Sequence, residues 1–262
     1  MTINFVSVTE VPGRKATKEE LQMLCLRYHV LSRYAQGKRV LEVACGPGVG
    51  LGYLAGKAER VIGGDCSKDL LRIAQKHYGG AIGLVCLNAE TLPFEDNYFE
   101  VVGLLEAIYY LPEPDRFIDE AYRVLKQNGT LILCLPNVDR PKFCASPLSH
   151  KYFSVSELSN LLFKHNFDPK IFGVFPVYNR RSGKHKDVMI RIAVSLGAGK
   201  LLRTIPKGNK LKEFLLGQNM VLKEEIEKEI QQGLISDIQL SPLDMRVPDN
   251  RYKVLYAIAQ KK

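Results

Sequence analysis

Apolar residues fall into two kinds of segment that alternate along the chain. Short runs rich in Val, Ile and Leu predict buried strands, and longer stretches with apolar residues every three or four positions predict amphipathic helices. The predicted strands cover residues 38–44, 60–64, 82–87, 99–105, 130–135, 171–178 and 251–260. The predicted helices cover residues 18–36, 51–58, 68–77, 115–125, 154–165 and 222–232. This alternation is typical of an α/β protein built from βαβ units around a doubly wound, mainly parallel sheet.

Polar residues mark several of the predicted helix boundaries. A Ser or Thr followed three residues later by Glu has the spacing of a capping box, in which each side chain bonds the other residue's backbone N–H. A lone Ser can also cap a helix start, and Asn-Gly is a common helix stop. The predicted boundary residues are Thr17 with Glu20, Ser67, Asn128–Gly129, and Ser154 with Glu157. Between the last two predicted strands lies an insertion of about seventy residues.

Composition places the chain among ordinary globular proteins. It has 262 residues, of which 46% are hydrophobic and 25% charged. The most apolar stretch, residues 190–205, contains three basic residues and is too short to span a bilayer. The first thirty residues lack the pattern of a signal peptide. We therefore expect a cytoplasmic protein without a transmembrane segment.

Six cysteines in a chain of this length do not form a disulfide framework, and no CxxC spacing indicates a zinc site. Four of them end apolar runs and are expected to be buried, reduced thiols: Cys45, Cys66, Cys86 and Cys134. We expect no metal site and a reducing compartment.

The positive charge is confined to one segment. The net charge is +9, and residues 180–212 carry ten Lys or Arg and one acid, so the rest of the chain is neutral. Such a segment is most often a solvated face. Two other interpretations are a surface for an anionic acceptor or membrane and a surface for RNA. Aromatic residues lie only beside it, which disfavours a base-stacking platform.

Candidate chemistry gathers where the predicted strands end. Ligands of open α/β sheets bind beyond the carboxyl ends of the strands. Those ends carry Glu42 to Gly50, Asp65, Asn88–Ala89–Glu90, Glu106 and Pro136–Asn137. The glycine run does not fit the dinucleotide pattern GxGxxG, because Leu51 takes the last place, and no Gly-Lys-Ser/Thr of a P-loop follows it.

Four segments together resemble class I S-adenosylmethionine (SAM)-dependent methyltransferases, in particular their type 11-like domain. The resemblance covers about residues 38–137 and rests on residues 40–50 (VLEVACGPGVG), 88–94 (NAETLPF), 105–112 (LEAIYYLP) and 122–129 (YRVLKQNG). It implies that Gly46 and Gly48 flank the methionine portion of SAM and that Asp65 binds the ribose hydroxyls. The full set of cofactor-binding residues that it implies is Tyr28, Glu42, Cys45, Gly46, Gly48, Asp65, Cys66, Asn88, Ala89, Glu90 and Glu106.

The resemblance also implies a Rossmann-like sheet of seven strands, mainly parallel, with an antiparallel last strand. A helical insert lies between the last two strands. The expected divisions are an N-terminal helical cap at 1–37, a SAM-binding core at 38–178, a basic insert or lid at 179–248 and the last core strand at 249–262.

Two departures from the family pattern bear on the chemistry. Asn88 stands where Asp is commoner, and Tyr110 stands where many relatives have His, which removes one possible base. Candidate catalytic residues are His150, Tyr109 and Tyr110, although the tyrosines also suit the walls of an acceptor pocket. Cys144 has no surroundings that indicate a nucleophile, and the Asn-Pro-Pro-Tyr motif of amide and exocyclic-amine methylation is absent.

The sequence thus predicts SAM-dependent methylation of a hydroxyl or amine on a small-molecule or lipid-carried acceptor, with S-adenosylhomocysteine as the other product. The alternatives are an RNA methyltransferase and a SAM-binding regulator without catalytic activity. The oligomeric state is left open.

Overall fold

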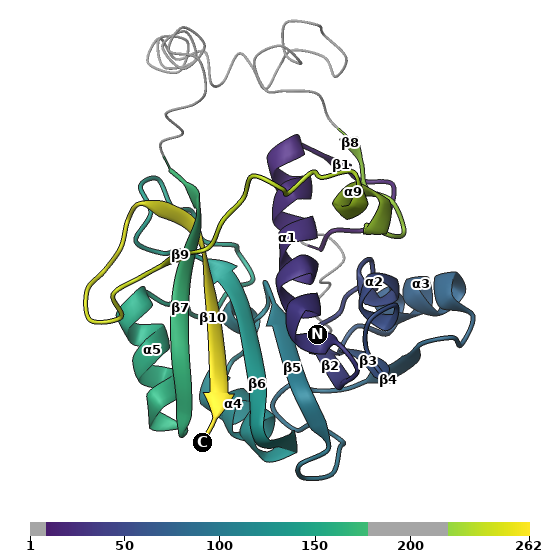
Figure 1. Cartoon of the computed structure of the whole chain (residues 1–262), viewed down its shortest axis with the longest axis horizontal. Coiled ribbons are helices and arrows are strands. Elements are labelled where there is room, and N and C mark those ends of the chain that lie inside the picture. Colours follow the sequence, from purple (N-terminus) through teal and green to yellow (C-terminus); the bar gives the residue numbers. More distant parts are fainter. Residues whose placement is uncertain (1–8, 178–219) are drawn as a thin grey trace, which may run out of the picture.

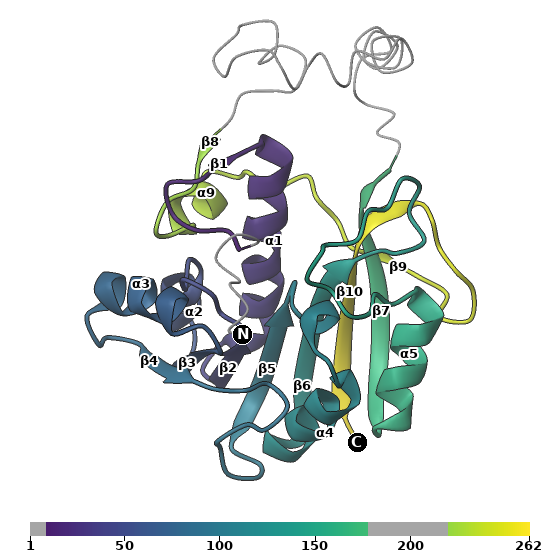
Figure 2. The same ribbon diagram turned by 180° about the vertical axis from the view of Figure 1, so that it is seen from behind.

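A computed structural model describes residues 9–177 and 220–262, and it contains one large sheet with helices on both faces (Figures 1 and 2). The strand order is β4-β3-β2-β5-β6-β10-β7-β9. The strands are β2 (Arg39–Val43), β3 (Arg60–Asp65), β4 (Gly83–Cys86), β5 (Phe99–Leu105), β6 (Leu125–Pro136), β7 (Phe167–Pro176), β9 (Ser241–Pro242) and β10 (Tyr252–Lys261).

The seven predicted strands are present, and the sheet is mainly parallel as predicted. Neighbours from β4 to β6 pair in parallel, whereas β10, the last strand, pairs antiparallel with both β6 and β7. The two-residue strand β9 adds an eighth member at one edge, which the sequence pattern did not predict.

The helices divide between the two faces of the sheet. The helices are α1 (Lys18–Ala35), α2 (Leu51–Ala55), α3 (Lys68–Tyr78), α4 (Pro114–Val124), α5 (Val155–Lys164), α9 (Glu227–Gln231) and the single 3₁₀ turn η2 (Ile108–Tyr110). Apolar side chains of α1 and α2 pack with one face of the sheet, and those of α4 and α5 pack with the other. Two hydrophobic cores therefore enclose the central strands.

The predicted helix caps are formed. Both capping boxes are closed, at Thr17 with Glu20 and at Ser154 with Glu157. The Ser67 side chain accepts a hydrogen bond from the Leu70 backbone N–H at the start of α3. These local bonds satisfy helix N–H groups that have no partner within the helix.

Three details differ from the sequence prediction. Asn128–Gly129 does not stop a helix, because α4 ends at Val124 and the pair forms a bulge inside β6, with Asn128 at φ +62°. Strand β7 begins at Phe167 and not at the predicted Ile171. Buried Phe167, Pro169 and Ile171 alternate there with exposed residues, as in a strand with one covered face. Of residues 222–232, only Glu227–Gln231 is helical.

Two of the four cysteines predicted to be buried are exposed. Cys45 and Cys134 are buried, but Cys66 and Cys86 lie at the ends of β3 and β4, and β4 is an edge strand. The outer side of β4 has no neighbouring strand to cover Cys86, and Cys66 follows the end of β3, where it lines the cavity described below. All six cysteines carry free thiols.

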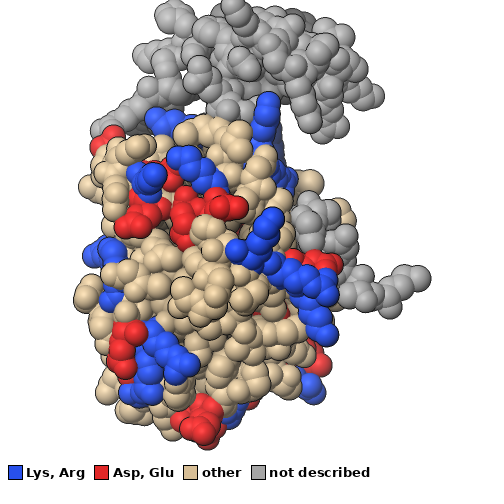
Figure 3. All heavy atoms as spheres, turned by 90° about the vertical axis from the view of Figure 1, so that its right-hand side faces the viewer, with Lys and Arg blue, Asp and Glu red and all other residues tan. Residues whose placement is uncertain are grey.

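A second, two-stranded sheet joins the beginning of the described chain to its later part. Strands β1 (Lys15–Ala16) and β8 (Met220–Val221) pair antiparallel, and Gly13 N–H donates to the Leu222 carbonyl at 2.8 Å. The basic stretch 180–212 lies outside the described residues. On the face shown in Figure 3, basic and acidic side chains of the described residues are intermixed. Within the described residues, no helix is long and apolar enough to cross a membrane.

Candidate functional site

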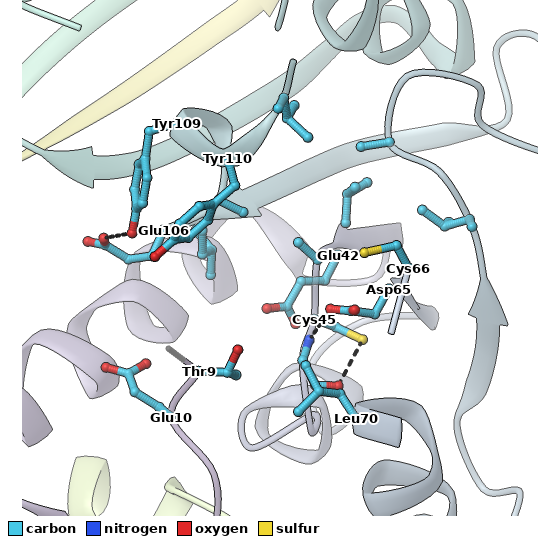
Figure 4. A pocket seen from close by; sticks show the side chains of 18 of the residues that line it. Thr9, Glu10, Glu42, Cys45, Asp65, Cys66, Leu70, Glu106, Tyr109 and Tyr110 are labelled. Atoms are coloured by element: carbon cyan, nitrogen blue, oxygen red, sulfur yellow. Dashed lines mark hydrogen bonds between the residues drawn. The ribbon is translucent and has the colours of Figure 1, made fainter. Parts of the chain in front are cut away.

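A cavity of about 480 Å³ opens at the carboxyl ends of β2, β3 and β5. The predicted site residues that line it are Tyr28, Glu42, Cys45, Gly46, Asp65, Cys66, Asn88, Ala89, Glu90, Glu106, Tyr109, Tyr110 and His150. Figure 4 shows two ends, which we name by their residues. The glycine-turn end contains Gly46, Asp65 and Glu42, and the tyrosine end contains Glu106, Tyr109 and Tyr110.

Asp65 holds the glycine turn in place. Its Oδ2 accepts from the Gly46 N–H and its Oδ1 from the Ser67 N–H, both at 2.8 Å. Burial raises the pKa of this carboxyl, although the two backbone donors oppose the shift. A carboxylate oxygen can accept more than one hydrogen bond, so Asp65 can hold the turn and two ligand hydroxyls together.

Gly46 provides a close approach for a ligand. It adopts φ +58°, a conformation that favours glycine, and a Cβ built on it would lie 3.1 Å from Thr9 Cγ2. The backbone of the turn is therefore narrowly enclosed between Asp65 and the N-terminal segment. A side chain at this position would fill space that a ligand needs.

Glu42 presents a buried oxygen without a partner. Its Oε1 accepts from the Tyr28 hydroxyl at 2.8 Å, and its Oε2 is buried with no hydrogen bond. Burial raises the pKa of this carboxyl from 4.5 to about 8, while the Tyr28 hydroxyl opposes the rise. A buried oxygen without a hydrogen bond costs free energy, and a ligand donor such as an ammonium group would remove that cost. The Glu42 oxygen therefore favours binding of a ligand that carries such a donor.

Gly48 and Gly50 serve the packing of the turn. Gly48 does not line the cavity; its carbonyl accepts from the Tyr78 hydroxyl at 2.6 Å, and its α-carbon faces α3. A Cβ on Gly50 would lie 2.2 Å from the Tyr28 ring. Gly50 thus allows Tyr28 to reach Glu42. The cofactor contact expected of Gly48 stays a prediction. In the structure, Gly48 contacts Tyr78 and α3, which are contacts that pack the turn.

Asn88 and Glu90 bend the chain beside the glycine-turn end. Asn88 Oδ1 accepts from the Glu90 N–H at 3.0 Å, as in an Asx turn, and Glu90 Oε1 accepts from the Glu113 N–H at 2.7 Å. The Asn88 side-chain NH₂ is the part of the amide suited to reading a purine edge. Ala89 is buried next to it and presents only a methyl group.

The tyrosine end combines a carboxylate with stacked rings. Glu106 Oε2 accepts from the Tyr109 hydroxyl at 2.9 Å, and the Tyr109 ring stacks on Tyr152 with centroids 4.6 Å apart. Tyr110 donates to Ser146 at 3.2 Å. Burial, and then the Glu106 charge, raise the pKa of Tyr109 well above its usual value. This phenol is therefore a poor base near neutral pH, and both tyrosines form a wall.

His150 also lines the tyrosine end, and its backbone is bound to the same wall. Its N–H donates to the Tyr109 carbonyl at 2.8 Å. The segment after β6 is thereby fixed against η2. Among the three candidate catalytic residues, His150 has the side-chain type that serves most often as a general base in enzymes.

Sequence reasoning missed three polar residues that line the cavity: Thr9, Glu10 and Arg27. Arg27 lies on the buried face of α1, and the spacing of Leu24, Arg27 and Leu31 could have indicated it. Thr9 and Glu10 belong to a segment without a periodic pattern. Nothing in that part of the sequence signals their place over the cavity.

These features fit SAM. Asp65 has the acceptors that ribose hydroxyls require, and the unpartnered Glu42 oxygen suits the ammonium of the methionine portion. At the turn, Gly46, which has no side chain and adopts φ +58°, lets a ligand approach its backbone closely. In the described residues, no cluster of His, Cys, Asp and Glu is arranged to hold a metal ion.

Comparisons with known proteins agree with this geometry. Residues 41–133 match the family described as methyltransferase domain. A demethylmenaquinone methyltransferase of Clavibacter sepedonicus is 31% identical over 100 residues, which cover 37% of this chain and 41% of that protein. A phthiotriol/phenolphthiotriol dimycocerosates methyltransferase 1 of Mycobacterium ulcerans is 36% identical over 110 residues, which cover 40% of this chain and 41% of that protein. The chain thus matches less than half the length of these two curated relatives.

A solved structure shares the fold. The structure of a SAM-dependent methyltransferase from Archaeoglobus fulgidus has a TM-score of 0.56 and 18% identity, over 94% of this chain and 95% of that one. The strand order, the polar strand ends and the family match agree. Residues 41–133 therefore belong to a class I methyltransferase domain.

Proposed function

We propose that this protein transfers the methyl group of SAM to a small-molecule or lipid-carried acceptor. The observation that carries the proposal is the joining of the two ends in one cavity. The glycine-turn end offers Asp65 and Glu42 to the cofactor, and the tyrosine end offers a ring-lined wall to an acceptor. The two curated relatives are named for methylation of demethylmenaquinone and of phthiotriol/phenolphthiotriol dimycocerosates, which supports an apolar acceptor for this protein.

Methyl transfer depends mainly on how the acceptor is positioned relative to the methyl group. Bound SAM supplies a methyl group on a cationic sulfur, so that the C–S electron pair leaves with sulfur as the acceptor's lone pair forms the new bond. Asp65 would hold the ribose on the adenosyl side, the Gly46 turn would flank the methionine portion, and Glu42 would hold its ammonium group. The wall of Tyr109 and Tyr110 confines the acceptor to the direction of attack. Orientation of this kind can contribute roughly 7–11 kcal/mol to lowering a barrier.

A proton must leave a hydroxyl or amine acceptor during transfer. Glu106 and His150 are the groups at the tyrosine end that could accept it. We assign His150 only a supporting part, because an acceptor held in line needs little basic assistance. The lid role of residues 179–248 and a cytoplasmic location are further parts of this proposal.

A cofactor-binding measurement tests the assignment. Asp65→Ala should weaken SAM binding at least tenfold, measured by titration calorimetry, because it removes acceptors for the ribose and for the Gly46 N–H. The matched control is Asp69→Ala, four residues later, whose carboxylate pairs with Arg72 on the exposed side of α3. Equal affinity of the Asp65→Ala variant and the wild-type protein would contradict the assignment.

RNA methylation is the second candidate, favoured by the +9 stretch at 180–212. It predicts an RNA affinity that falls steeply as salt is raised. A salt-insensitive affinity, or none, would exclude it. A regulator without catalytic activity would bind SAM and transfer no methyl group to any acceptor.

A further inference from the structure

A buried arginine faces the cavity and is paired with the N-terminal segment. The Arg27 guanidinium binds the Glu10 carboxylate through two bonds, Nη1 to Oε2 at 2.6 Å and Nη2 to Oε1 at 3.0 Å. Both residues line the cavity. The proposed function uses neither of them, so the pair requires its own explanation.

The two partners differ in how firmly they are held. The Arg27 side chain is 10% exposed and lies within the α1 core, whereas the Glu10 side chain is 33% exposed. Glu10 belongs to a short segment before β1, and Thr9 beside it covers the Gly46 turn. Glu10 is therefore the partner nearer to solvent, while Arg27 is held at the cavity by the α1 core.

Arg27 requires an anion at all times. Burial disfavours its charged form, but Glu10 and Glu106 outweigh burial and hold its pKa well above the ordinary value. Removing one partner of a buried ion pair strongly destabilises a protein. The Nε of Arg27 is buried without a hydrogen bond, so Glu10 leaves one donor of the guanidinium unpaired. A second planar carboxylate could use Nε together with one terminal nitrogen.

We propose that Glu10 is an internal mimic of a ligand carboxylate, and that a carboxylate-bearing ligand displaces it from Arg27 when the cavity fills. The exchange replaces one carboxylate by another, so the guanidinium is never left unpaired. The N-terminal segment then acts as a competitor built into the chain. The carboxylate could come from SAM or from the acceptor. If it comes from SAM, this inference rests on the proposed function.

Two binding comparisons separate the sources. In the first, SAM is compared with decarboxylated SAM, which keeps the ammonium and lacks the carboxylate. If SAM supplies the carboxylate, Glu10→Gln should strengthen SAM binding about threefold to tenfold, and Arg27→Met should weaken it at least tenfold. Neither change should alter the affinity for decarboxylated SAM by more than about twofold.

The second comparison uses octanoate and octanamide with the cofactor site saturated by S-adenosylhomocysteine. If the acceptor supplies the carboxylate, octanoate should bind more tightly to Glu10→Gln than to the wild-type protein, and Arg27→Met should abolish the difference between octanoate and octanamide. The matched control in both comparisons is Glu19→Gln, because Glu19 pairs with Lys253 outside the cavity lining, at 2.7 Å. It should behave as wild type.

Arg27→Lys guards against a variant that fails to fold, since it keeps the charge and loses the two-pronged geometry. It should show the weaker binding while still unfolding in one cooperative transition, which demonstrates that the variant is folded. If neither SAM nor octanoate responds to Glu10 or Arg27, the pair is structural and the inference is overturned. If SAM does not bind even the wild-type protein, the proposed function fails, and the octanoate comparison still decides this inference.

Discussion

The glycine-turn end and the tyrosine end of the cavity are assembled in different ways. At the glycine-turn end, Glu42, Gly46 and Asp65 lie on or directly after β2 and β3, and the Asp65 carboxylate accepts from the Gly46 N–H. At the tyrosine end, η2 and the segment after β6 contribute the side chains, while α1 and the residues before β1 lie along both ends, with Tyr28 bonded to Glu42 and Thr9 over Gly46. The first end is a product of local chain geometry, and the second depends on how distant segments meet.

This difference has a functional meaning. An end built from strand termini keeps its shape among proteins of the same fold, because the sheet fixes it. An end assembled from separate segments can change with each of them. We therefore expect the glycine-turn end to hold the common cofactor and the tyrosine end to decide which acceptor is used.

The largest expected effect concerns Glu42 and pH. The buried carboxyl has a pKa raised to about 8, and in the unfolded chain it titrates near 4.5. Between these values the folded protein keeps a proton that the unfolded chain has lost, so stability should fall as pH rises and level off above 8. Each pH unit corresponds to about 1.4 kcal/mol, or on the order of 3–4 kcal/mol from pH 5 to 8.

Urea unfolding of the wild-type protein and Glu42→Gln at pH 5, 6.5 and 8 measures this effect. The difference in unfolding free energy between them should change with pH by that amount. The exposed Glu19→Gln variant should give a curve parallel to wild type. If Glu42→Gln is also parallel to wild type, Glu42 is ionised in the folded protein and the assignment of its raised pKa is wrong.

A substitution at Gly50 should separate packing from cofactor contact. In the structure, a Cβ on residue 50 would lie only 2.2 Å from the Tyr28 ring. Gly50→Ala therefore forces the methyl group and the ring apart. Overpacking of this kind typically costs about 1–3 kcal/mol. The unfolding free energy should fall by that amount, and SAM affinity should fall too, because Tyr28 moves away from Glu42.

Gly56→Ala is the matched control. Gly56 is the C-cap of the same short helix, at φ −66°, and an added Cβ would meet nothing closer than 3.7 Å. It should leave both quantities nearly unchanged. Equal losses in the two variants would mean that the Tyr28 contact has no special part in the site.

The smallest expected effect concerns His150. If orientation dominates, His150→Ala should lower kcat less than tenfold and leave SAM affinity unchanged, as measured with the acceptor once identified. General base catalysis typically contributes 10²- to 10⁴-fold. A loss beyond a hundredfold, with a pH profile that loses its acidic limb, would make His150 the base and reverse this order of importance.

The sequence predicted the sheet, the caps and the glycine-turn end because each depends on short-range patterns. Gly46, Asp65 and Glu42 follow strands that periodicity identifies, and Thr17 with Glu20 form a box within four residues. Asn128–Gly129 misled the prediction, because the same dipeptide suits a helix end and a bulge within a strand.

The tyrosine end shows where such patterns stop. Glu10 reaches Arg27 across a turn that no local signal marks, and His150 meets Tyr109 only because η2 and the segment after β6 pack together. Contacts between segments far apart in sequence are decided by tertiary packing. Gly48 shows that a local motif can also suggest a contact that the cavity lining does not include. The glycine motif predicted a ligand contact, but the Gly48 carbonyl accepts a hydrogen bond from the Tyr78 hydroxyl and the residue does not line the cavity.

The central claim is methyl transfer from the cavity, and one measurement tests it most directly. Methyl-labelled SAM is incubated with the protein and an extract of its source cells, which is then fractionated into lipids, small molecules, RNA and protein. We predict label in the lipid or small-molecule fraction with the wild-type protein, and at least tenfold less with Asp65→Ala at the same SAM concentration, below saturation. Label in the RNA fraction alone, or no label in any fraction while SAM binds tightly, would contradict the account.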